Sequence, residues 1–461
     1  FFSTLWVLFC NMPLRRSLAG PKKTVKSKRC KYCGETDHSS KNCPTLDISD
    51  STVSRAISCM SWIPQGASSK SIAKPEASDQ YLATDERNIV GRALDSESDS
   101  ENEFVVTEDV DFLFVAGKVN SRKEEFSLYV MVYDCDKDRM FQRQDIPMAQ
   151  PPLHLTWLDF KSYDERGSYA AVCSMLPHIE IFDLDRCLDL RAAVILGGPI
   201  DRENLYNPPD QGGSWRSGLM AGSHTQSVLC CDWNKNQRNV MATGSADTTV
   251  KLWDLETAEC ANTLRLHKSE VLRMKWHPQD KCMLLTSGLT DKTAVLTRAD
   301  RDGEHVKFDV ESSIETIQWI PHLPSMFAVG TSDGLCKVYD TKKPGKPLYM
   351  FQAHDNAECS VITFNQHIPG LMASGSNDKS ISLWDVRKGH KLVVNRTLGV
   401  GEVFALEFNM NNPYLLVGGG SAAEELVWTI QDDIKDCGFE IGSAGGASSS
   451  SSSSNENDME G

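Results

Sequence analysis

Short apolar runs that end in an aromatic residue recur along the chain and predict a series of β-strands. The seven aromatic residues that end these runs are Trp62, Trp157, Trp233, Trp276, Trp319, Phe364 and Phe408. The last five are separated by 43, 43, 45 and 44 residues. The wider gaps before them fit one period plus an insertion. A regular period of this length indicates a repeat architecture in which each repeat is one small sheet.

A second marker supports the same count. Strand-ending aromatic–aspartate pairs occur at Tyr133-Asp134, Phe182-Asp183, Trp253-Asp254, Tyr339-Asp340 and Trp384-Asp385. Thr297-Arg298 and Trp428-Thr429 stand at the same phase without that chemistry. Both markers predict seven four-stranded blades, so the chain is expected to form an all-β, seven-bladed WD40 propeller over residues 56–434. Closing a ring removes the free sheet edges on which aggregation would start.

The repeats also carry polar residues in fixed positions. The expected structural WD-repeat residues are His224, Asp247, Trp253, His267, Asp291, Asp333, His354, Asp378 and Trp384. Each aspartate is placed in the turn between the second and third strands, where its carboxylate can accept hydrogen bonds from the histidine and from backbone amides. A Thr or Ser such as Thr243, Thr286 or Ser374 can accept the indole N–H. The His–Asp pairs therefore predict scaffolding and not catalysis.

Insertions and a tail interrupt or follow the ring. Residues 64–111 contain DSESDSENE, which is too charged to fold alone. Ser96, Ser98 and Ser100 each have an acid three residues later and are candidate phosphorylation sites, although the loop could simply be solubilising. A second insertion, residues 191–222, is rich in Gly and Pro and offers Tyr206 and Trp215 as exposed anchors. Residues 443–461 are expected to be a disordered, Ser-rich acidic tail.

The charge is unevenly distributed. The net charge of −15 argues against a general nucleic-acid coat, yet residues 12–43 hold nine Lys/Arg against two acids. The 15 cysteines form no regular framework, which favours free thiols in a reducing compartment. Residues 1–29 are expected to be a disordered basic leader, in which the apolar start (1–11) is interpreted as a gene-model artefact, with a signal anchor or a genuine peptide as alternatives.

Four residues in the leader region have the spacing of a metal site. Cys30, Cys33, His38 and Cys43 form C-x2-C-x4-H-x4-C, which predicts a CCHC zinc knuckle over residues 30–44 that binds one Zn²⁺. Zinc knuckles bind single-stranded nucleic acid. The candidate contacts are Lys28, Arg29, Lys31, Tyr32 and Lys41. Asp37 stands beside the expected base platform, so a structural or protein-binding knuckle remains an alternative. The upstream PKKTVKSKR run also fits a nuclear import signal.

The chain resembles a known family over residues 56–432. The matching pieces are AISCMSWIPQG, the acidic stretch after it, LHLTWLDF, IEIFDLD and HTQSVLCCDWNKNQRNVMATGSADTTVKLWD. They are similar to the periodic tryptophan protein 1 family of nuclear and nucleolar WD-repeat proteins. The resemblance implies a role in large-ribosomal-subunit assembly and rRNA maturation, and in animals in chromatin and rRNA gene transcription. The zinc knuckle is not part of that family's pattern.

Three functions remain open at this point. The leading one is a non-catalytic scaffold for ribosome biogenesis in the nucleus and nucleolus, with pre-ribosomal proteins and rRNA as partners. A chromatin regulator that binds histones is the second. The third is a substrate receptor of a cullin-type ubiquitin ligase, since ISLWDVR resembles the box in which Arg387 would contact the adaptor. No motif supports an enzyme, a small-molecule substrate or a membrane location, and we expect a monomer within larger complexes.

Overall fold

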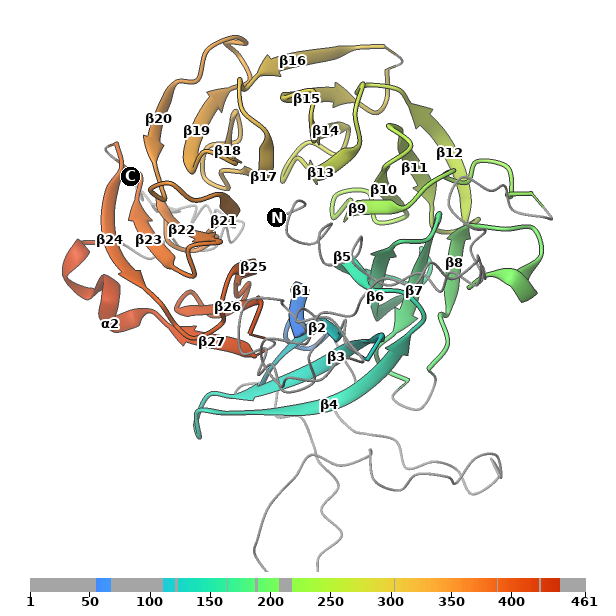
Figure 1. The fold of residues 1–461 in the computed structure, drawn as a ribbon, viewed down its shortest axis with the longest axis horizontal. Helices are drawn as coiled ribbons and strands as arrows, with labels where there is room; N and C mark the ends of the chain where they lie inside the picture. Colours follow the sequence, from blue (N-terminus) through green and yellow to red (C-terminus); the bar gives the residue numbers. More distant parts are fainter. Residues whose placement is uncertain are drawn as a thin grey trace, which may run out of the picture.

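The computed structural model describes residues 55–67, 111–120, 123–163, 165–186, 190–206, 218–301, 303–387, 389–422 and 424–439. Within them the chain forms seven antiparallel sheets arranged as the blades of a ring around a central channel (Figure 1). The predicted all-β, seven-bladed WD40 propeller is confirmed. The predicted knuckle, leader, acidic tail and most of the 64–111 insertion lie outside the described residues.

The first three blades each contain four strands in sequence order. Blade one consists of β1 (Arg55–Ile63), β2 (Asp111–Asn120), β3 (Glu125–Asp134) and β4 (Arg139–Met148). Blade two consists of β5 (Pro152–Phe160), β6 (Arg166–Ser174), β7 (His178–Asp183) and β8 (Val194–Gly197). Blade three consists of β9 (Val228–Trp233), β10 (Val240–Ser245), β11 (Val250–Asp254) and β12 (Glu259–Leu264).

The next three blades repeat this order, and the last is shorter. Blade four consists of β13 (Val271–Trp276), β14 (Met283–Gly288), β15 (Thr293–Arg298) and β16 (His305–Asp309). Blade five consists of β17 (Ile314–Trp319), β18 (Met326–Thr331), β19 (Leu335–Asp340) and β20 (Tyr349–Gln352). Blade six consists of β21 (Cys359–Phe364), β22 (Leu371–Ser376), β23 (Ile381–Asp385) and β24 (Lys391–Arg396). Blade seven consists of β25 (Val403–Phe408), β26 (Leu415–Gly420) and β27 (Glu425–Thr429), followed by α2 (Gln431–Ile434) and η3 (Lys435–Cys437).

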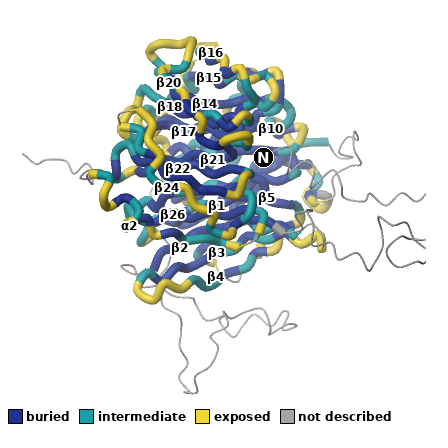
Figure 2. Tube along the Cα trace, turned by 60° about the vertical axis from the view of Figure 1, so that its left-hand side comes forward, coloured by how far each residue is buried: buried dark blue, intermediate teal, exposed yellow. Residues whose placement is uncertain are grey.

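The first strand of each blade is the innermost. Successive inner strands lie side by side around the channel, and β25 of blade seven returns to β1 of blade one, so the ring is closed (Figure 1). The tube in Figure 2 shows strands nearer the channel, such as β21 and β22, buried, whereas outer strands such as β24 and many connecting loops are more exposed. Alternate strand residues point to opposite faces of a sheet, so each blade can pack against both neighbours. One apolar cluster accordingly joins Trp62 and Phe114 of blade one to Val417 of blade seven.

The two faces of the ring differ in their loops. Turns between second and third strands, such as that at Asp247, lie on the face that we call the Asp-turn face. Loops between first and second strands, such as residues 234–239, lie on the opposite face, which we call the loop face. The histidine loops belong to the Asp-turn face because His224 contacts Asp247.

The second insertion begins later than the sequence suggested. Residues 194–197, inside the range expected to be an insertion (191–222), form β8, the outer strand of blade two. This boundary was wrong because the apolar run VILG directly precedes a Gly-Gly-Pro turn and was grouped with it. The connection to blade three is residues 198–227, which includes η2 (Arg202–Asn204) and an isolated bridge between Pro199 and Leu219.

Candidate functional site

In blade three the recurring polar residues of the repeat form one continuous chain of hydrogen bonds. The indole N–H of Trp253 donates to Thr243 Oγ1 at 2.8 Å. Thr243 Oγ1 lies 2.8 Å from His224 Nε2, and His224 Nδ1 lies 3.0 Å from Asp247 Oδ2. Since the indole can only donate, the threonine hydroxyl is free to donate to Nε2, which leaves the proton on Nδ1 facing the carboxylate.

The protonation states agree with that assignment. Burial lowers the pKa of His224 despite the neighbouring carboxylate, so its imidazole is neutral at pH 7. Burial alone would raise the pKa of Asp247, but hydrogen bonds from His224, Thr249 and the Thr225 amide outweigh it and lower the pKa. Both imidazole nitrogens are therefore occupied inside the fold, and neither can accept a proton from a substrate.

Blades four and six repeat the chain with one difference. His267 Nδ1 lies 3.1 Å from Asp291 and its Nε2 lies 2.8 Å from Thr286. In blade six His354 contacts Asp378 at 3.1 Å and Ser374 at 2.8 Å, and Trp384 donates to the same serine at 2.9 Å. Blade four carries Thr297 at the tryptophan position, so Thr286 has no indole to accept.

Blade five keeps the aspartate without a histidine. Asp333 accepts from Ser312 at 2.8 Å and also from Thr331. These bonds lower the pKa of Asp333 against the opposing effect of burial. The aspartate thus holds its turn in every blade from three to six, whether or not a histidine is present.

The periodic aromatic residues have a role that the sequence did not reveal. The indole of Trp276 donates to Asp232 O at 3.1 Å, that of Trp319 to Lys275 O at 3.1 Å, and that of Trp62 to Glu407 O at 2.9 Å. Each bond joins one blade to the one before it, and the last closes the ring. Trp157 and Trp233 instead bond within their own blades, to Ser168 Oγ and Arg238 O.

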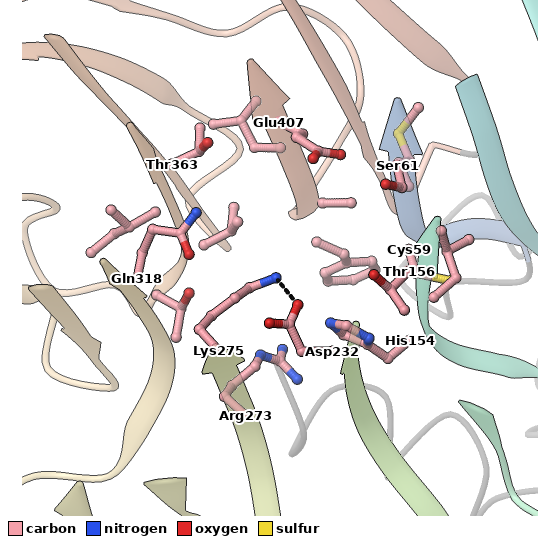
Figure 3. Close-up of a pocket in the computed structure, with 18 of the residues that line it drawn as sticks. Cys59, Ser61, His154, Thr156, Asp232, Arg273, Lys275, Gln318, Thr363 and Glu407 are labelled. Carbon is pink, nitrogen blue, oxygen red and sulfur yellow. Dashed lines mark hydrogen bonds and ion pairs between the residues drawn. The ribbon is translucent and has the colours of Figure 1, made fainter. Parts of the chain in front are cut away.

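The residue before each periodic aromatic is polar and lines the central channel (Figure 3). These seven residues are Ser61, Thr156, Asp232, Lys275, Gln318, Thr363 and Glu407. They surround a cavity of about 170 Å³. Asp232 Oδ1 pairs with Lys275 Nζ at 3.2 Å, and its Oδ2 accepts the Trp276 amide at 2.7 Å.

The channel is lined by charged side chains of both signs, and these side chains interact with residues of neighbouring blades. Burial raises the pKa of Glu407, although Lys275 opposes the shift, and its Oε2 accepts the Trp62 amide at 3.1 Å. Burial would lower the pKa of Lys275, but the two carboxylates outweigh it and raise the pKa. Because the two carboxylates and the lysine hold neighbouring blades together, the arrangement suits a role in stabilising the ring better than a role in catalysis.

A second set of inter-blade hydrogen bonds lies on the loop face. They are made by the residues that directly follow the periodic aromatic residues. Asn234 Oδ1 accepts from the amides of Asn236 and Gln237, while its Nδ2 donates to Lys281 O of the next blade at 2.7 Å. Asn365 does the same in blade six and donates to Pro413 O at 2.7 Å.

His277 plays the same part in blade four. Its Nδ1 accepts from the Gln279 and Asp280 amides, and its Nε2 donates to Pro324 O at 2.7 Å. The available sequence signal was the repeated pair of an aromatic with Asn or His, at positions 233–234, 276–277, 364–365 and 408–409.

Arg387, the candidate contact for a ligase adaptor, lies on the surface but has partners within the chain. Its guanidinium forms a bidentate pair with Asp385 at 2.8 and 2.9 Å. It also donates to Gly438 O at 2.7 Å and stacks on Phe439, with its Cζ 4.2 Å from the ring centroid. This geometry fixes the end of the described chain to blade six.

The remaining candidates are placed as follows. Tyr206 is 43% exposed, and its hydroxyl donates to Glu180 at 2.7 Å, so it is anchored to blade two. Trp215 lies outside the described residues, as do the predicted zinc ligands, nucleic-acid contacts and phosphorylation sites. Among the described residues, no group of three or more His, Cys, Asp or Glu side chains could hold a metal ion. No helix in the described part of the chain is long and apolar enough to cross a membrane.

Comparison with known proteins agrees with the fold. The family model "WD domain, G-beta repeat" matches residues 219–254 and 345–385. An uncharacterised WD repeat-containing protein of Schizosaccharomyces pombe is 31% identical over 72% of this chain and 64% of its own length. The periodic tryptophan protein 1 homolog of Drosophila melanogaster is 26% identical over 71% of this chain and 69% of its own length.

Periodic tryptophan protein 1 of Saccharomyces cerevisiae is 31% identical over 58% of this chain and 50% of its own length. The alignments thus span between half and about two thirds of these curated relatives.

Proposed function

We propose that this chain, a WD-repeat protein of the periodic tryptophan protein 1 family, is a non-catalytic scaffold in ribosome biogenesis. The observation that carries the proposal is similarity to two proteins of that name over 58% and 71% of the chain, on a ring that closes with seven blades. Large-subunit assembly and rRNA maturation are the roles which that family resemblance implies, and we propose that the protein carries them out in the nucleus and nucleolus.

The described residues support a scaffold more than an enzyme. The three His–Asp pairs hold turns, and the channel charges hold neighbouring blades. A rigid ring presents two faces and a rim, so several partners can bind at once through exposed loops. We propose pre-ribosomal proteins and rRNA as these partners.

Sedimentation tests the proposed function directly. A tagged full-length chain in a nuclear extract should co-sediment with large pre-ribosomal particles and should leave them after RNase treatment or at high salt. Sedimentation only as a free protein, in extracts where large-subunit precursors are intact, would contradict the proposal. Retention on histone peptides instead would favour the chromatin alternative.

We also propose that Cys30, Cys33, His38 and Cys43 bind one Zn²⁺ and assist RNA contact. Three thiolates and one imidazole are a ligand set that tetrahedral zinc prefers. The full chain should contain one equivalent of zinc by elemental analysis, and Cys33→Ser should remove it and weaken RNA crosslinking. An unchanged crosslink in the zinc-free variant would separate the metal from RNA binding.

A further inference from the structure

The connection between β19 and β20 of blade five concentrates positive charge on the surface. Residues 341–348, which we call the lysine loop, contain Lys342, Lys343 and Lys346, and all three lysines are exposed. No side chain among the described residues forms an ion pair with any of them. Three neighbouring ammonium groups without carboxylates repel one another, so the loop favours an acidic neighbour.

The lysine loop belongs to the loop face of the ring. Thr341 Oγ1 donates to Ser325 O, in the connection between β17 and β18, at 3.0 Å. The Asp-turn face of this blade has the opposite charge, since exposed Glu311 and Asp355 stand in the connections before β17 and after β20. An acidic segment that approaches blade five is therefore directed to its loop face.

The described chain ends close to the same blade. Arg387 donates to Gly438 O and stacks on Phe439, which places both residues against the loop between β23 and β24 of blade six. That loop also contains His390, whose ring stacks on Phe351 of β20 with the ring centroids 4.6 Å apart. One loop of blade six thus contacts both the end of the described chain and the strand that follows the lysine loop.

Residues 443–461 carry the charge that the lysine loop lacks. They contain Glu456, Asp458 and Glu460 but no lysine or arginine, and these acids follow a run of seven serines. Glu456 is 17 residues beyond Phe439. A flexible linker of that length has an end-to-end distance of roughly 21–25 Å and extends to about 56 Å at most. The acids can therefore reach a loop of the adjacent blade, although they lie outside the described residues.

We propose that residues 455–460 dock on the lysine loop, so that the chain covers its own basic surface on blade five. The three carboxylates would pair with the three ammonium groups, and Met459 would cover exposed Leu348 at the end of the loop. Each exposed ion pair is weak by itself. The linker offsets this weakness, because a short flexible tether gives an effective concentration on the order of millimolar.

Charges nearer to Phe439 offer the acidic residues a poorer site. Lys435 lies between exposed Asp432 and Asp436 of α2 and η3. Arg387 already forms a bidentate pair with Asp385. The lysine loop has no such competing carboxylate on its own side chains' pairs, so it is the more favourable destination within reach.

Docking would make the lysine loop accessible only to a ligand that displaces residues 455–460. RNA, the partner proposed above, is a polyanion of higher charge density and can compete for the same ammonium groups. This consequence rests on the proposed function, whereas the docking itself does not.

Carbodiimide coupling of the dilute full-length protein tests the docking, because the reagent joins a carboxylate to an amine that it touches. The acids of residues 455–460 should become linked to the lysine loop. The links should be at least about fivefold fewer in 1 M salt, where the screening length is about 3 Å. Exposed lysines of the Asp-turn face should stay unlinked to these acids, and the controls are Lys268, Lys292 and Lys379.

Exchanging the charges separates a specific contact from non-specific coupling. The triple variant Lys342→Glu/Lys343→Glu/Lys346→Glu should lose the links. The triple variant Glu456→Lys/Asp458→Lys/Glu460→Lys should lose them too, and the combined sextuple variant should regain links between the same two segments. The exposed pair of Lys161 and Glu165, at 2.6 Å, should couple in every variant and confirms that the reagent is active and the fold intact.

Four results would overturn the proposal. They are an absence of links in the native protein, links to Lys391 or Lys435 instead, no recovery in the combined variant, and links that form only between isotopically labelled and unlabelled copies. The last result would assign the lysine loop to a second copy of the chain.

Added single-stranded RNA should lower the coupling yield at least about twofold at low salt. An unchanged yield would refute the displacement by RNA. The coupling within the chain does not depend on co-sedimentation with pre-ribosomal particles, so failure of the docking and failure of the proposed function are distinguishable.

Discussion

At the residue scale, one hydroxyl group in the middle of blade three, and one in blade six, serves two buried neighbours at once. Thr243 accepts the Trp253 indole and contacts His224, and Ser374 does the same for Trp384 and His354. A buried polar atom without a partner is costly, so removing the hydroxyl group leaves an indole and an imidazole unsatisfied at once. The hydroxyl is therefore more important to stability than its small size suggests.

Thr243→Val tests this role with a matched control in the next blade. The substitution preserves the shape of the side chain but leaves the Trp253 N–H and His224 Nε2 without their hydrogen-bond partner. It should therefore lower the free energy of unfolding by about 2–4 kcal/mol. Thr286→Val in blade four should cost less, because Thr297 replaces the indole there. Urea titration of both variants measures the difference, and equal losses would show that the indole bond contributes nothing.

His178 should make the stability of the fold depend on pH, in a direction that its burial determines. The ring is fully buried, neither nitrogen has a hydrogen-bond partner among the described residues, and burial lowers its pKa to about 4. Because the folded pKa lies below the unfolded value, proton binding favours the unfolded chain. This contribution to stability is present above pH 6.5 and is lost as the pH falls toward 4.

His178→Leu, which cannot be protonated, should show a smaller fall in thermal midpoint between pH 6.5 and 4 than the native protein. Thermal melts across that pH range provide the measurement. Parallel curves for the two proteins would exclude His178 as the source of the acid sensitivity.

At the element scale, the strands of a blade were readable from the sequence, but the bonds between blades were not. The 43-residue spacing places Trp233, Trp276 and Trp319 on equivalent strands without saying where their indoles point. Two of the three donate across a blade boundary, and the third donates within its blade. The choice depends on the twist and stacking of neighbouring sheets, which no local pattern encodes. The fastening role of Asn365 was hidden for the same reason, since its second partner is 48 residues away.

Asn365→Ala should loosen the joint between blades six and seven. The asparagine caps its own loop and also donates to Pro413 O, so its loss should cost about 1–3 kcal/mol. Ile320 occupies the same position in blade five without either bond, which makes Ile320→Val a mild control. Limited proteolysis of the 409–414 loop should accelerate in the first variant only; an unchanged cleavage rate would show that the bond does not hold the joint.

At the scale of the whole molecule, ring closure depends on the contact between the first and last blades. Trp62 bonds to Glu407 twice, through its indole N–H to the backbone carbonyl and through its amide to the carboxylate. Trp62→Phe keeps an aromatic ring against Phe114 but removes the indole bond across the closure. Because the first and last blades of the ring meet there, a weakened contact should let the ring open before the blades unfold.

The expected change in hydrogen exchange is confined to the strands at the closure, which distinguishes it from a general loss of stability. In Trp62→Phe, amides of β1 and β25 should exchange faster while those of β13 and β17 keep their protection. Trp157→Phe is the matched control, since its indole bonds to Ser168 within blade two and crosses no boundary. Uniform acceleration around the ring would mean that the seven blades open as a single unit. The Trp62 indole bond would then contribute no more to keeping the ring closed than the other inter-blade contacts do.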